Sequence, residues 1–148
     1  MNGRWHIWIL LVALGSISAV NSGAAKYAQN LSLEAHILRL TGAETVDCGT
    51  HTGTNASSNA LHESLACARE AAKQRRAFRI IQRGRTEDSE IATGVLGQTD
   101  GAVLWFDYDS APCGGPGCTE RFETKPCALS NIEVLPGDGG THSLGCVH

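Results

Sequence analysis

The chain has 148 residues, of which 42% are hydrophobic and 18% charged, and its formal net charge at pH 7 is -3. This length suits one ordinary domain with a buried core and leaves little room for a second. The near-neutral charge provides no global field that would attract nucleic acid or an anionic membrane, so we expect neither as a partner.

A secretory signal peptide is predicted at residues 1–25. Residues 1–6 carry one arginine and no acid, and residues 7–20 are almost wholly apolar. The apolar run is shorter than the roughly 20 residues that span a bilayer, and small residues such as Ala24 and Ala25 offer cleavage sites after it. An uncleaved anchor is the alternative. We therefore expect a secreted or periplasmic protein without a membrane span after cleavage.

Residues 26–46 are predicted to form either a short helix or a flexible tether that precedes a single domain at residues 47–148. The helix is indicated by Gly42, which would end it, and by apolar residues at helical spacing. These apolar residues are Leu31, Ala35, Ile37 and Leu38. Residues 47–59 are rich in Gly, Thr, Ser and Asn and contain no large apolar side chain, which predicts a loop.

The main helix is predicted over residues 58–76. Apolar residues recur there at steps of four, three and four and form one stripe. They are Leu61, Leu65, Ala68 and Ala72. Ser57 or Ser58 can cap the amino end, and Cys67 lies beside the stripe, where a disulfide could hold the helix by its flank.

After the helix, the hydrophobic period changes to two. Residues 78–83, 91–98 and 102–108 predict strands, with Asp100-Gly101 as a tight turn between the last two, and further strands are expected within residues 121–136. Alternation places Tyr108 on one face of its strand and Asp107 on the other. The predicted fold class is α+β, with one main helix packed on an antiparallel meander of about four strands and cross-linked by disulfides.

Six cysteines follow the predicted signal peptide, at positions 48, 67, 113, 118, 127 and 146. Export predicts disulfides, and six cysteines allow 15 pairings among which the sequence does not choose. Our preferred pairing joins Cys48 to Cys67, Cys113 to Cys118, and Cys127 to Cys146. A zinc site that includes His142 and His148, or one redox-active pair, is the alternative. The spacing does not match structural zinc knuckles, so we predict no metal and no cofactor.

Asp107 and Asp109 lie on the same face of their strand, next to a Gly-rich loop. Such a pair could bind calcium with loop carbonyls or act as an acid and a base in hydrolysis. The simpler interpretation is that aspartates at a strand end bond their own backbone. A concave pocket that holds both carboxylates would favour an enzyme, and a flat surface would favour recognition.

A basic segment covers residues 69–85, with seven Lys or Arg against one acid. It could meet a polyanion, but three acids follow it directly. If the strands pair, we expect Asp107 to project from the same face as Arg79 and Arg83. A solvated, salt-bridged face is therefore the preferred interpretation.

Sequence signatures of catalytic nucleophiles are missing. A triad could be drawn from His51 or His62 with Ser57, Ser64 or Asp47, but the predicted loop around His51 offers no rigid support. We assign no catalytic residue. The chain also contains short motifs, namely DCG at 47–49, LACA at 65–68, AFR at 77–79, DS at 88–89 and YDSAPCGG at 108–115, followed by Cys127. Together they resemble motifs of small periplasmic or secreted bacterial proteins with no assigned activity. The resemblance implies an envelope or extracellular domain.

These observations predict an exported binding or structural domain. Its possible contact residues are Arg79, Arg83, Asp107, Tyr108 and Asp109. The partner is unknown, and an envelope or extracellular protein or a polyanion fits the basic face. The alternative is a small exported hydrolase, or a metal-dependent enzyme, that uses Asp107 and Asp109.

Overall fold

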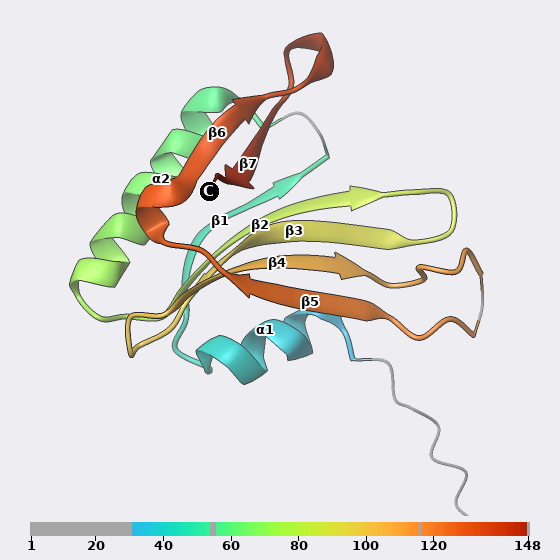
Figure 1. The fold of residues 1–148 in the computed structure, drawn as a ribbon, viewed down its shortest axis with the longest axis horizontal. Helices are drawn as coiled ribbons and strands as arrows, with labels where there is room; N and C mark the ends of the chain where they lie inside the picture. Colours follow the sequence, from blue (N-terminus) through green and yellow to red (C-terminus); the bar gives the residue numbers. More distant parts are fainter. Residues whose placement is uncertain (1–30, 54–55, 116, 148) are drawn as a thin grey trace, which may run out of the picture.

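The computed structural model describes residues 31–53, 56–115 and 117–147, so the predicted signal peptide lies outside the described residues. The fold is α+β, with a five-stranded sheet in the order β1-β2-β3-β4-β5, a separate two-stranded hairpin and two α-helices (Figure 1). In chain order the elements are α1 (Leu33–Thr41), β1 (Val46–Thr52), α2 (Ser58–Lys73), β2 (Phe78–Arg85), β3 (Glu90–Gly97), β4 (Val103–Asp109), β5 (Arg121–Pro126), the 3-10 turn η1 (Leu129–Asn131), β6 (Ile132–Pro136), the 3-10 turn η2 (Asp138–Gly140) and β7 (His142–Cys146).

The sheet is mixed. Strands β1 and β2 run parallel and are joined through α2, whereas β2, β3, β4 and β5 form an antiparallel meander. A parallel pair needs such a crossover, because a tight turn can only reverse the chain. The predicted turn between β3 and β4 is confirmed: Gly101 has φ 92° and its N–H bonds the Gln98 carbonyl at 3.0 Å.

Helix α2 packs on one face of the sheet together with the β6–β7 hairpin, and α1 packs on the other (Figure 1). We call these the α2 face and the α1 face. The larger core lies on the α2 face and includes Leu61, Leu65, Phe78, Ile80, Val95, Trp105, Ile132 and Leu144. The smaller core lies under α1 and contains Leu33, Ile37, Ile81, Ala92, Leu96, Phe106 and Tyr108.

The main helix is close to its prediction, because its amphipathic stripe packs on the sheet. Ser57 is the cap, and its Oγ accepts the N–H of Ala60 at 3.2 Å. The predicted stripe of α1 is only partly right. Ile37 is 1% exposed, but Leu38 is 54% exposed, and Leu33 takes the second buried position. Among the described residues, no helix is long and apolar enough to cross a membrane.

Two details of the fold prediction are wrong. One main helix on about four antiparallel strands is predicted, whereas the sheet is mixed and has five strands, and a second helix, α1, packs on it where a short helix or a tether is predicted. The predicted loop at residues 47–59 contains strand β1. This strand buries only Cys48, so it lacks the alternation by which strands are found. Its pairing is interrupted between Asp47 and Thr50, where the Asp47 carboxylate accepts the N–H of Gly49 at 3.0 Å.

The preferred disulfide pairing is confirmed, with bonds Cys48–Cys67, Cys113–Cys118 and Cys127–Cys146. The first ties β1 to the flank of α2, and the third ties the end of β5 to β7. The second closes a small ring in the loop between β4 and β5. All six sulfurs are used, so the zinc alternative for these cysteines is wrong.

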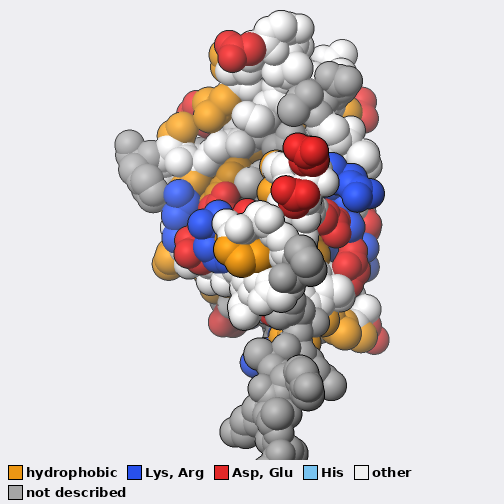
Figure 2. All heavy atoms as spheres, turned by 90° about the vertical axis from the view of Figure 1, so that its right-hand side faces the viewer, with side chains coloured by type: hydrophobic (Ala, Val, Ile, Leu, Met, Phe, Trp, Pro, Cys, Tyr) orange, Lys and Arg blue, Asp and Glu red, His pale blue; other side chains and the backbone are white. Residues whose placement is uncertain are grey.

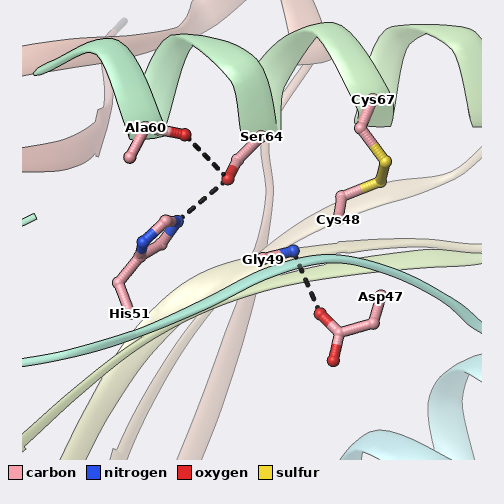
Figure 3. Close-up of a disulfide and its surroundings, with 7 residues drawn as sticks. All are labelled: Asp47, Cys48, Gly49, His51, Ala60, Ser64 and Cys67. Atoms are coloured by element: carbon pink, nitrogen blue, oxygen red, sulfur yellow. Dashed lines mark hydrogen bonds between the residues drawn. A yellow bond between two sulfur atoms is a disulfide. The ribbon is translucent and has the colours of Figure 1, made fainter. Parts of the chain in front are cut away.

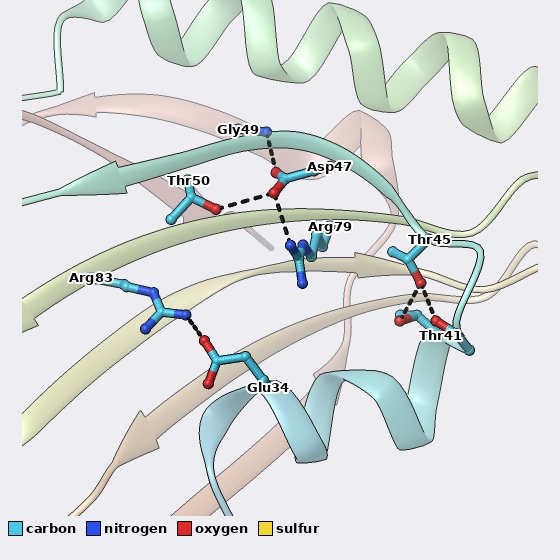
Figure 4. A network of polar contacts seen from close by, with 9 residues as sticks. Glu34, Thr41, Thr45, Asp47, Gly49, Thr50, Arg79 and Arg83 are labelled. Carbon is cyan, nitrogen blue, oxygen red and sulfur yellow. Dashed lines mark hydrogen bonds and ion pairs between the residues drawn. The ribbon is translucent and has the colours of Figure 1, made fainter.

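Helix α1 is joined to the sheet by polar contacts around its apolar face (Figure 4). Arg83 donates to Glu34 on α1 and, at 2.7 Å, to Glu90 on β3. The bond from Arg83 is the main cause that lowers the pKa of Glu34. At the amino end of the helix, Glu120 accepts the N–H of Leu31 at 2.9 Å. Residues 31–41 are therefore packed on the domain as a structural part of it.

Candidate functional site

A groove of about 490 Å³ opens on the α2 face where β2 and β4 end and β3 begins. Its floor is formed by the sheet and its wall by β7, beyond the region that α2 covers. Residues from five strands and the end of β1 line the groove, namely Gly53, Gln82, Arg83, Gly84, Ile91, Ala92, Thr93, Asp107, Tyr108, Asp109, Arg121, Thr141, His142 and Ser143. Pockets of a few hundred Å³ suit small molecules.

The hairpin wall is fixed to the sheet by Gln82. Its side-chain N–H donates to the carbonyl of His142 at 3.4 Å, and its Oε1 accepts the N–H of Leu144 at 2.7 Å. These two bonds close the inner end of the groove. The Cys127–Cys146 disulfide holds the base of the same hairpin, so the wall is positioned both covalently and by hydrogen bonds.

Both predicted carboxylates lie in this groove. Asp107 pairs across β3 and β4 with Thr93, and Asp109 pairs with Ile91. One oxygen of Asp107 accepts the indole N–H of Trp105 at 3.1 Å, and one oxygen of Asp109 accepts the N–H of Ala111 at 3.0 Å. The other oxygen of each has no protein partner among the described residues, so each carboxylate keeps acceptor capacity for a ligand.

Arg121 brings a positive charge to the same floor, because it lies opposite Asp109 in the β4–β5 register. Opposite charges across two strands commonly pair. Here, within the part of the chain that the structure describes, neither Arg121 nor the two aspartates form an ion pair. Ile91, which is 38% exposed, supplies apolar surface on β3, on the side of Asp109 that faces away from Arg121. The groove therefore offers unpaired charges of both signs beside an apolar side chain.

Among the other predicted contact residues, Arg83 and Tyr108 also line the groove, but alternation turns their side chains to the α1 face. Tyr108 points to the α1 face and is 7% exposed, and burial is the main cause that raises the pKa of its hydroxyl. Arg79 and Arg83 also lie on the α1 face. The expectation that Asp107 shares their face is wrong, because Asp107 is in line with Thr93 and Gln82, and alternation turns Arg83 the other way.

The basic segment is partly neutralised by ion pairs. Arg79 bonds Asp47 at 2.9 Å, as Figure 4 shows, and Arg83 bonds Glu34 and Glu90. For Asp47, burial opposes ionisation, but the bond from Arg79 and the N–H of Gly49 outweigh it and lower the pKa. Arg79 and Arg83 therefore hold the α1 face together. The remaining arginines of the segment, Arg69, Arg75, Arg76 and Arg85, are exposed.

His51 and Ser64 do meet, at 2.9 Å between Nε2 and Oγ (Figure 3). The Ser64 hydroxyl donates its one hydrogen to the carbonyl of Ala60 at 3.0 Å, so His51 completes the pair by donating from Nε2. Ser64 is 3% exposed, and Gly49, at φ 144°, packs against its Oγ so closely that a side chain would collide. The arrangement ties β1 to α2 and leaves no room for a substrate at Oγ.

Sequence reasoning missed Arg121 and His142 as groove residues. Arg121 follows the small disulfide loop, and His142 lies after residue 136, beyond the last predicted strand. The pairing of β4 with β5 and the docking of the hairpin bring them to Asp109, and neither is visible in a local pattern. Among the described residues, no three His, Cys, Asp or Glu side chains form a set that could hold a metal ion.

The chain matches no family model, no curated protein and no solved structure. The argument for function therefore comes from the groove itself.

Proposed function

We propose that this protein is an exported binding domain, secreted or periplasmic, that recognises a ligand in the groove between the β6–β7 hairpin and strands β3 to β5. Export is supported by the apolar segment at residues 7–20 and by three disulfides, which form and persist in oxidising compartments. The observation that carries the binding function is the groove, in which unpaired charges of both signs meet an apolar patch on a cross-linked scaffold.

The scaffold around the groove suits recognition. Its floor consists of paired strands and its wall is fixed by Gln82 and a disulfide, so binding would order few additional groups. The end of the molecule at which the groove opens displays acidic and basic side chains close together (Figure 2). Such a mixed surface favours a ligand with polar and charged groups over a purely apolar one.

The test is a binding screen by NMR on the exported, processed protein. Small probes of different charge, including amines, carboxylic acids, sugars and dipeptides, would be added one at a time. We expect at least one class to shift the amide signals of Thr93, Asp107 and Asp109 in a saturable way. Shifts confined to other regions, or no saturable shift with any class, would refute binding in this groove.

A hydrolase is the second candidate, because the groove takes in both Asp107 and Asp109 with His142 on the opposite wall. General acid–base catalysis uses such groups when both reach one scissile bond. The test is turnover of chromogenic esters, glycosides, phosphates and peptides by the same preparation. Turnover that disappears in both Asp107→Asn and Asp109→Asn would favour the enzyme. Binding without turnover would favour the recognition domain.

A further inference from the structure

We infer that the groove binds a small amino compound that carries both an ammonium and a carboxylate, that is, an amino acid or a short peptide. This inference rests on the proposed binding function and adds the chemical class of the ligand. It is drawn from three features of the floor: two carboxylates with free oxygens, one unpaired guanidinium on the next strand and an apolar side chain on the other side of the carboxylates.

The carboxylates provide the place for the ammonium group. Asp107 and Asp109 are two residues apart on β4, so their side chains leave the same face of the sheet. Each has one oxygen engaged by a fixed neighbouring donor and one oxygen open. An ammonium group has three donors and no acceptor, and so it can bond both open oxygens and still reach a third acceptor such as the Thr93 hydroxyl.

Arg121 provides the place for the carboxylate. It is directly opposite Asp109 on β5, yet the Asp109 side chain bonds the backbone of Ala111 instead. The guanidinium is therefore open to a ligand, and its fork of N–H donors matches a carboxylate in two-point contact. A molecule with ammonium and carboxylate ends would satisfy the charges that β4 and β5 leave unpaired.

An apolar side chain of the ligand would extend from the ammonium end over Ile91, on the side of Asp109 that faces away from Arg121. The Ile91 side chain is 38% exposed on the groove floor, in register between Gly84 on β2 and Asp109 on β4. Gly84 has no side chain to cover it, so the isoleucine remains open to apolar contact. A second hollow adjoins the groove through Gly53 and Gly84 and is lined by charges of both signs, including Arg85, Glu87 and Asp88, and it would accommodate a longer peptide.

The experiment compares four probes by NMR titration of the exported protein: alanyl-leucine, butylamine, butyrate and glucose. We expect alanyl-leucine to bind most tightly, butylamine more weakly, and butyrate and glucose not at all in the groove. Asp107→Asn, Asp109→Asn and Arg121→Gln should each weaken the dipeptide by at least about tenfold, the loss expected for one charge-assisted hydrogen bond.

Matched controls change the same charges just outside the groove. The control variants are Glu123→Gln and Lys125→Gln. On β5, Glu123 lies opposite Asp107 and Lys125 lies opposite Trp105, and neither residue lines the groove. Both should leave dipeptide affinity unchanged within about twofold. Asn keeps an acceptor for the Trp105 indole and for the Ala111 N–H, and dispersed spectra with an unchanged unfolding midpoint would verify that each variant is folded.

The outcomes separate this inference from the proposed function. Preferred binding of butyrate or glucose in the groove would overturn the ligand class and leave the binding function standing. Butylamine binding as tightly as the dipeptide would overturn the pairing of Arg121 with a ligand carboxylate. If none of these probes, and no other class in the wider screen, shifts the groove signals, the binding function itself fails.

Discussion

Removing the disulfides one at a time should reveal how strongly each loop depends on its cross-link. Bonds Cys48–Cys67 and Cys127–Cys146 each join residues 19 positions apart, whereas Cys113–Cys118 joins residues 5 apart. The chain-entropy relation predicts losses in unfolding free energy of about 3 kcal/mol for each longer loop and about 2 kcal/mol for the short one. Pairs of Cys→Ala changes avoid leaving a free thiol that could mispair.

The two longer bonds are controls for one another. Each contains one buried cysteine of the same core, Cys48 at 7% and Cys127 at 4% exposure, so the loss of packing is similar in both variants. The assay is urea unfolding followed by the fluorescence of Trp105, the only tryptophan after residue 8. A small domain has about 5–15 kcal/mol of stability, so all three variants should stay folded in buffer.

The pattern of losses would decide whether the reasoning is right. It would be supported if the two long-loop variants lose equal amounts of unfolding free energy and both lose more than the short-loop variant. The unfolding free energy of the long-loop variants should also depend more steeply on urea concentration, because their unfolded chain is less constrained. A loss for the Cys113–Cys118 pair that matches or exceeds the others would refute it. Such a result would mean that the short ring stabilises native contacts of the β4–β5 loop rather than restricting the unfolded chain.

Three further changes test other parts of the structure. Ser64→Ala should lower the free energy of unfolding by about 1–3 kcal/mol, because the half-buried imidazole of His51 loses its partner, and an unchanged urea midpoint would contradict this structural role. The N–H of Leu31 is the main cause that lowers the pKa of Glu120. The stability that this carboxylate contributes is therefore present above its ordinary pKa of about 4.5 and is lost as the pH falls through the lower folded-state value. When melting temperatures are measured over a pH series, Glu120→Gln should reduce the fall in melting temperature below that pH. A variant whose melting temperature falls as steeply as that of the unsubstituted protein would count against the contact. Gly97→Ala should destabilise by about 1–3 kcal/mol because its Cβ would collide with the Phe78 ring, and equal melting temperatures would show that the ring moves aside without cost.

Helix α2 could be predicted because its own pattern determines how it packs. The residues Leu61, Leu65 and Ala68 lie on one side, and Ser57 caps the end. The meander of β2 to β5 was predictable for a similar reason, since consecutive strands with a tight turn pair with their neighbours. The disulfide pairing was predictable for the same reason, because every bond joins a cysteine to the next cysteine along the chain.

Strands β1 and β7 could not be predicted, because each buries a single residue. Cys48 is buried in β1 and Leu144 in β7, and polar or small residues fill the rest. These strands are held by partners from elsewhere: β1 by the parallel edge of β2, and β7 by β6 and by Gln82. Their existence depends on tertiary contacts that no window of the sequence contains.

Only part of the candidate site could be predicted from the sequence. The alternation along β4 put Asp107 and Asp109 on one face, and the structure confirms that both belong to one concave surface. The same alternation could not tell which face Arg79 and Arg83 would share, because that depends on a register across three strands. Arg121 and His142 join the groove only through the register of β5 and the docking of the hairpin.

The β6–β7 hairpin is a covalently closed unit: the Cys127–Cys146 bond seals its base, and the η2 turn at its far end extends away from the sheet (Figure 1). Because closing a longer loop adds only a slowly growing entropic cost, residues inserted at this tip would be insulated from the folding of the core. The hairpin is therefore a natural position for grafting foreign sequence or a reporter tag, and for lineage-specific length variation that reshapes one wall of the groove without altering its floor.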